Sequence, residues 1–170
     1  FLTANKFCYT VYMTIRTFVK LVIAIVVTQL AGIIGSLFTF SAIPTWYATL
    51  TKPALNPPSW IFGPVWTTLY VLMGVSVFLI WQKGWERKDV KIAVSIYGVQ
   101  LVLNALWSIV FFGMQSPGLA LVNIALLFVS IVSTMILFYK ISRPAMYLLV
   151  PYILWVSFAS YLNYAIYALN

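Results

Sequence analysis

Charge is what this 170-residue sequence has least of. Charged residues make up 7 % of the chain, and only two of them, Glu86 and Asp89, are acidic. A water-soluble domain carries about 25 % charged residues, which keep its surface hydrated. Because hydrophobic residues account for 64 % of this chain, lipid must replace water around most of its surface. We therefore expect an integral membrane protein.

Histidine is absent altogether, and the only cysteine is Cys8, so an intrachain disulfide is excluded. General acid–base and nucleophilic catalysis need titratable groups that the apolar runs do not contain. Metal ligands would have to come from one cysteine, scattered methionines and two loop acids, and haem could not be held through histidine. We predict no catalytic residues, no metal site and no required cofactor. A metal-free porphyrin or a sterol needs no such ligands.

The chain is nevertheless basic, with ten lysines and arginines and a net charge of +8. A nucleic-acid-binding protein gathers such residues on one hydrated face. Here they lie between apolar runs, where they act as orientation signals, so we expect no nucleic-acid partner.

Five apolar runs are long enough to cross the bilayer as helices, which takes about 20 residues for a hydrocarbon core of about 30 Å. They cover residues 18–40, 60–81, 92–112, 117–139 and 145–169. The one long connection, residues 41–59, contains four of the eight prolines. Pro151 lies inside the fifth run, where we expect it to kink the helix. No linker interrupts the pattern, so residues 1–170 are predicted to form a single all-α domain.

The basic residues divide unequally between the two sides of the membrane. Nine of them precede the first run, lie in its first turn, or lie in the second and fourth connections, whereas Lys52 is alone on the other side. Lysine and arginine concentrate on the cytoplasmic side. The division predicts an odd number of spans, with the N-terminus inside and the C-terminus outside. Trp81 and Trp85 are expected in the aromatic belt at the inner interface.

Amides and aromatic residues are the chemistry left inside the membrane. Gln100 and Asn104 share one face of the third helix, which Trp107 and Phe111 extend. The amides could bond to neighbouring helices or could line a ligand site, and their spacing does not decide between the two. On the fifth helix, Trp155, Phe158, Ala159 and Leu162 form a slot-like stripe for which packing is the default explanation.

A ladder of small residues on the first helix has a structural meaning. Ala24, Thr28, Gly32 and Ser36 recur at every fourth position. Such a ladder lets two helices approach closely, within the same bundle or in a dimer.

Several segments of the chain agree in order and spacing with one known family over about residues 29–170. These are WYATLTKP (46–53), PPSW (57–60), FGPVWT (62–67), QLVLNALW (100–107), FFG (111–113), PYILW (151–155), FA (158–159) and LN (162–163). Through these segments the sequence strongly resembles the translocator protein family, also called tryptophan-rich sensory or TspO proteins.

The resemblance implies a five-helix bundle, usually a homodimer, that binds porphyrins, sterols and benzodiazepine-type ligands among its helices. It implies that Trp66 and Gln100 reach a polar ligand atom, with Asn104 one turn from Gln100. Trp155 and Ala159 would form the fifth-helix wall. Trp107 and Phe158 lie beside these residues on the same helices, so we include them in the predicted ligand site. Tyr47 would contribute from the loop and Leu119 from the fourth helix.

Two departures from the family pattern refine this reading. Leu55 stands where many members have tryptophan, so one wall of the loop differs. The sterol-recognition pattern of animal members lacks its basic residue after Tyr164, although such patterns are weak evidence even when complete. A microbial cell-membrane protein that handles tetrapyrroles is favoured over a cholesterol carrier.

Three functions remain to be weighed. The first is a membrane receptor or transport protein for porphyrins or haem, and also for sterols or benzodiazepine-type ligands. The second is a porphyrin-degrading enzyme that uses photo-oxidative chemistry, since acid–base groups are lacking. A passive channel is disfavoured, because aromatic side chains are expected to fill the bundle centre.

Overall fold

The computed structural model describes the backbone of residues 2–170 and the side chains of residues 14–170. Lys6 and Cys8, which entered the charge and cysteine arguments, therefore have side chains outside the described part. Every regular element in residues 2–170 is helical. The elements are α1 (Leu2–Ala42), α2 (Trp46–Thr49), η1 (Ser59–Ile61), α3 (Phe62–Trp81), α4 (Lys88–Ser108), η2 (Ile109–Gly113), α5 (Pro117–Ile141), α6 (Arg143–Tyr147) and α7 (Val150–Leu169).

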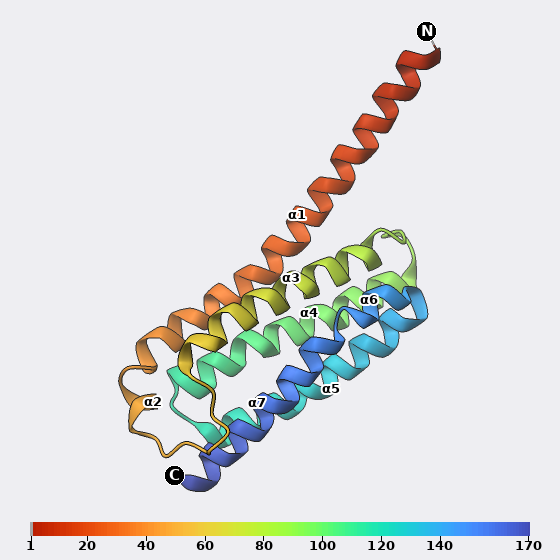
Figure 1. Cartoon of the computed structure of the whole chain (residues 1–170). Helices are drawn as coiled ribbons and strands as arrows, with labels where there is room; N and C mark the ends of the chain where they lie inside the picture. Colours follow the sequence, from red (N-terminus) through yellow and green to blue (C-terminus); the bar gives the residue numbers. More distant parts are fainter. Residues whose placement is uncertain (1) are drawn as a thin grey trace.

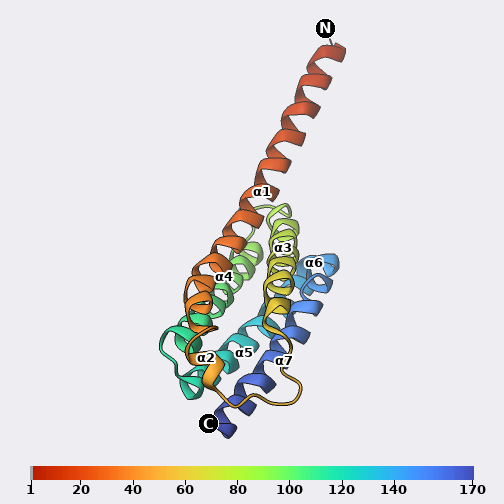
Figure 2. The ribbon, with the colours of Figure 1, turned by 60° about the vertical axis from the view of Figure 1, so that its left-hand side comes forward.

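Five of the helical stretches are long and apolar enough to cross a membrane, which confirms the predicted fold class. They are Thr14–Ala42, Ser59–Trp81, Lys88–Gly113, Pro117–Ile141 and Arg143–Leu169. Figure 1 shows the long helices side by side, with α1 extending well beyond the others at its N-terminal end. Figure 2 shows that the connection from α3 to α4 lies at one end of the bundle, whereas α2 and the C-terminus lie at the other.

The helix boundaries differ from the predicted ones in several places. Helix α1 begins at Leu2 rather than near residue 18, because a helix can continue into water after its apolar run has ended. The long first connection contains the short helix α2. The third span ends in a π-helical turn, Ile109–Gly113, in which the Met114 N–H donates to the Ile109 carbonyl at 2.8 Å.

Pro151 does more than kink the fifth span. The helix stops after Tyr147 and restarts at Val150, with Pro151 in the first turn of α7. Proline lacks an N–H and its ring clashes with the carbonyl four residues earlier, which here belongs to Tyr147. The predicted bend is therefore a break between α6 and α7.

The small-residue ladder of α1 packs against α3 in the same chain. Thr28 is fully buried, and its hydroxyl donates to the Tyr70 carbonyl at 3.0 Å. A methyl group added at Gly32 would come within 2.3 Å of the Tyr70 ring, and one added at Gly74 within 2.7 Å of the Ile25 Cα. Of the two alternatives, the structure favours packing within the bundle.

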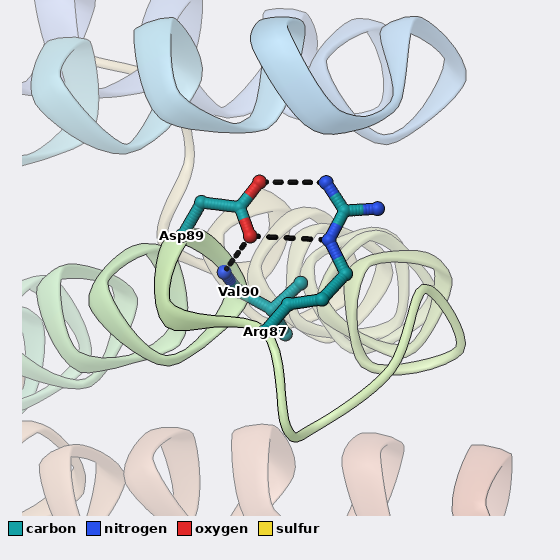
Figure 3. A network of polar contacts seen from close by, with 3 residues as sticks. All are labelled: Arg87, Asp89 and Val90. Carbon is teal, nitrogen blue, oxygen red and sulfur yellow. Dashed lines mark hydrogen bonds and ion pairs between the residues drawn. The ribbon is translucent and has the colours of Figure 1, made fainter.

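The two acidic residues lie near the start of α4, at the end of the bundle that carries most of the basic residues. The Arg87 guanidinium donates twice to the Asp89 carboxylate, at 2.7 and 3.1 Å (Figure 3). Asp89 also accepts from the Val90 N–H at 2.9 Å, and Glu86 pairs with Lys91 at 3.9 Å. Both acidic side chains thus pair with basic side chains near the start of α4. All four of these side chains are exposed.

Candidate ligand-binding site

A partly open cavity of about 320 Å³ lies among α1, α3, α4 and α7, beneath α2. This volume falls at the lower end of the range of about 300–1,000 Å³ that is typical of small-molecule pockets. None of the residues that line it carries a formal charge. The cavity is therefore suited to an apolar ligand with few polar groups.

Indole and phenyl rings form the walls of the cavity. Trp66 on α3 lies 5.6 Å from the Tyr70 ring and 6.4 Å from the Tyr152 ring, measured between centroids. On the opposite wall, Trp107 stacks on Phe111 at 5.1 Å. The π-helical turn brings Phe111 and Phe112 toward the cavity, because it displaces the last turn of the span from the α-helical path. Flat rings on facing walls favour stacking on a flat ligand.

One amide forms the floor of the cavity by joining three helices. Asn104 on α4 accepts a hydrogen bond from the Tyr70 hydroxyl on α3 and donates to the Tyr152 hydroxyl on α7 at 3.0 Å. All three residues are buried. These hydrogen bonds tie α3, α4 and α7 together at the floor of the cavity.

The roof is formed by the first connection, which is held by one hydrogen bond within itself and by two to the end of α7. The Tyr47 hydroxyl donates to Asn56 Oδ1 at 2.8 Å, and its ring packs edge-on against Phe112 at 5.6 Å. The Thr51 backbone N–H donates to the side-chain oxygen of Asn170 at 2.9 Å, and the Asn170 side-chain amide donates to the Thr51 carbonyl at 3.1 Å. Asn170 lies at the end of α7. Burial raises the pKa of Tyr47, and its hydrogen bond to Asn56 opposes this rise only in part, so the phenol stays neutral.

Helix α1 closes the remaining side with a more polar surface. Gln29, Gly32, Ser36 and Thr39 line the cavity there, and the Gln29 amide donates to the Thr67 carbonyl on α3 at 3.1 Å. Phe40, which also lines the cavity, has 74 % of its surface exposed. The opening of the cavity therefore reaches the apolar outer surface of the bundle.

One hydrogen-bond donor in the lining has no partner. Trp155 on α7 lines the cavity, and its indole N–H is buried without an acceptor among the described residues. Its ring is held between Phe62 at 6.0 Å and Phe158 at 5.7 Å. Buried donors are nearly always bonded in proteins. A hydrogen-bond acceptor on a ligand would satisfy this donor once a shift of the surrounding rings exposed the N–H to the cavity.

The structure brings six of the nine predicted site residues to the cavity. They are Tyr47, Trp66, Asn104, Trp107, Trp155 and Ala159. Gln100 lies one helical turn below Asn104, fully buried, and both polar atoms of its amide lack a partner among the described residues. The floor separates it from the cavity.

The other two predicted residues point elsewhere. Leu119 is 55 % exposed on the outer surface of α5, whereas its neighbour Ala120 is fully buried. Phe158 packs behind Trp155 and stacks on Tyr161 at 6.4 Å. It supports the wall without lining the cavity.

Some lining residues were not among those predicted. Tyr70 follows Trp66 by four positions, so the helical spacing of aromatic residues on α3 was a signal that could have identified it. Asn163 entered the sequence analysis only as part of a family motif, yet it both lines the cavity and forms hydrogen bonds. Its amide accepts from the Trp107 indole at 3.0 Å and donates to the Pro117 carbonyl at 2.9 Å. The α1 residues were interpreted only as a packing ladder.

Comparison with known proteins identifies the family. The profile of the TspO/MBR family matches residues 24–169, which include all five spans except the start of α1. The chain belongs to the TspO/MBR family. Six of the nine predicted site residues thus lie around one cavity of this TspO/MBR protein.

The relatives of this TspO/MBR chain come from bacteria, archaea and animals. It is 50 % identical to the tryptophan-rich protein TspO of Chlorobaculum tepidum over 82 % of this chain and 88 % of the relative. It is 44 % identical to the protein of the same name from Archaeoglobus fulgidus, over 89 % and 97 %. It is 38 % identical to the human translocator protein, over 84 % and 85 %. The chain is thus a multi-pass membrane protein of this family, and the two microbial relatives are more similar to it than the human one.

Proposed function

We propose that the chain binds flat, largely apolar tetrapyrroles of the porphyrin class in the cavity, and that binding serves transport or regulation. The observation that carries the proposal is the uncharged cavity with indole walls and one unpartnered indole N–H. Aromatic walls stack on a flat ring, and the Trp155 N–H can orient it. The name of the human relative, translocator protein, supports a transport role.

The test is a titration of tryptophan fluorescence with protoporphyrin in lipid nanodiscs. Trp66→Ala is expected to weaken binding by about 10- to 100-fold, since truncating a central tryptophan commonly costs this much affinity. Trp85→Ala is the matched control, because Trp85 packs on Trp81 and lies outside the cavity lining. Equal affinities of the two variants would refute the assignment of the cavity.

Trp155→Phe separates the hydrogen bond from the ring. The variant keeps an aromatic wall but lacks the N–H, so ligands with an acceptor atom should bind more weakly while hydrocarbon analogues bind equally well. Sterols and benzodiazepine-type compounds, titrated in the same way, would show how far the cavity's ligand range extends.

A second candidate function is photo-oxidative degradation of a bound porphyrin. It is favoured by the indoles of Trp66, Trp107 and Trp155 in the lining, which would lie beside the ligand ring. Porphyrin loss in the light but not in the dark would indicate photochemistry. Loss in both would indicate an enzyme.

We further propose a homodimer in a microbial cell membrane, with the N-terminus in the cytoplasm. The division of the basic residues supports this orientation. Since the α1 ladder is used inside the bundle, a dimer would form through another face. Mass measurement of the detergent-solubilised protein tests the oligomeric state.

A further inference from the structure

The roof end of the bundle contains a single charged side chain. Among residues 41–59, 109–119 and 160–170, all of which the structure describes, only Lys52 carries a formal charge. The other described basic residues belong to the opposite end. An anionic ligand that approaches the cavity from the roof end would therefore meet one cation.

Lys52 lies directly against the lining of the cavity. Its ammonium is 4.9 Å from the centroid of the Tyr47 ring, and Tyr47 lines the cavity. The ammonium donates to the Ala48 and Leu50 carbonyls at 3.4 and 3.3 Å, which is long for such hydrogen bonds. Because a carboxylate is a stronger acceptor than a carbonyl, it would compete well for this ammonium.

The interior of the cavity, by contrast, cannot accept a charge. No residue in its lining is ionic, and its walls are mostly aromatic. Burying a carboxylate there without a cation would be strongly unfavourable. A ring with acidic substituents must therefore keep these substituents outside the uncharged lining.

We propose that Lys52 recognises the carboxylate of an acidic macrocycle whose ring occupies the cavity. This inference rests on the proposed function and adds the orientation and chemical class of the ligand. Lys52 then sets a preference for acidic macrocycles over their neutral esters. The ring supplies the affinity that both kinds of ligand share.

The test compares protoporphyrin, which has two carboxylates, with its dimethyl ester in nanodiscs of zwitterionic lipid. Lys52→Met is expected to weaken binding of the acid by about 3- to 10-fold, as for a half-exposed ion pair, and to leave the ester unchanged. Lys52→Arg should restore the affinity for the acid. Added salt should weaken binding of the acid to the wild type more than to Lys52→Met.

Lys83→Met is the matched control, because it removes the same charge from the connection at the opposite end of the bundle. It should bind both ligands as the wild type does. Equal losses for the acid and the ester in Lys52→Met would show that Lys52 only shapes the loop, and no loss for either would also overturn the inference. If the wild type binds neither compound, the proposed function itself fails.

Discussion

At the scale of single residues, the two buried amides of α4 differ in their hydrogen bonding. Asn104 bonds to two buried tyrosine hydroxyls, whereas Gln100, one turn away on the same face, has no partner among the described residues. Both amides are buried, so each lost its hydrogen bonds to water on folding. Only Asn104 replaces them with hydrogen bonds inside the protein.

Replacing each amide by leucine should therefore have opposite effects. Asn104→Leu leaves the buried Tyr70 and Tyr152 hydroxyls without this hydrogen-bond partner. It should destabilise the protein by about 1–3 kcal/mol for each hydroxyl. Gln100→Leu removes unsatisfied polar atoms and should be neutral or stabilising. Thermal unfolding in one detergent measures both. If Gln100→Leu is the more damaging change, Gln100 has a partner that the structure does not contain.

The amides also show what spacing can and cannot predict. Helical spacing correctly placed Gln100, Asn104 and Trp107 on one inward face of α4. It could not show where along that face the cavity ends, because the floor depends on Tyr70 and Tyr152, which come from other helices. The same limit explains Leu119, whose orientation depends on how α5 is rotated in the bundle.

At the scale of elements, hydropathy predicted the five spans because the membrane fixes the length of a helix that crosses it. It could not find the π-helical turn at the end of α4 or the break before α7, since neither changes the apolar character of the run. These local departures matter for the site: the first brings Phe111 and Phe112 to the cavity wall, and the second begins the helix that carries Trp155.

The contact of α1 with α3 yields a prediction at this scale. Gly74→Ala would place a methyl group 2.7 Å from the Ile25 Cα, which is backbone and can yield only if α1 moves. We expect a loss of about 1–3 kcal/mol, as for other overpacked sites. Thermal unfolding checks this value.

Gly98→Ala on α4 is the matched control, because a methyl group there meets nothing within 4 Å. It should be neutral or should stabilise the helix by up to about 1 kcal/mol. Equal destabilisation by the two variants would mean that helix–helix distance is not the cause.

At the scale of the whole molecule, the topology predicts which residues are accessible from each side. In a Cys8→Ser background, single cysteines at Lys88 and at Ser116 should react with a membrane-impermeant reagent from opposite sides. Figure 1 places the start of α4 and the turn before α5 at opposite ends of the bundle. Reaction of both from the same side would contradict the five-span arrangement.

The uncharged lining of the cavity has a further consequence, which concerns protons. Tyr47, a phenol of the roof, has a pKa above its ordinary value of 10.0, so it remains neutral when a ligand covers it. With no ionic side chain in the lining, a neutral ligand should bind without proton uptake or release. Its affinity should stay constant between about pH 5 and 9, and its heat of binding should be the same in phosphate and in Tris buffer, as measured by titration calorimetry. A heat that differed between the buffers would reveal a titrating group coupled to the cavity.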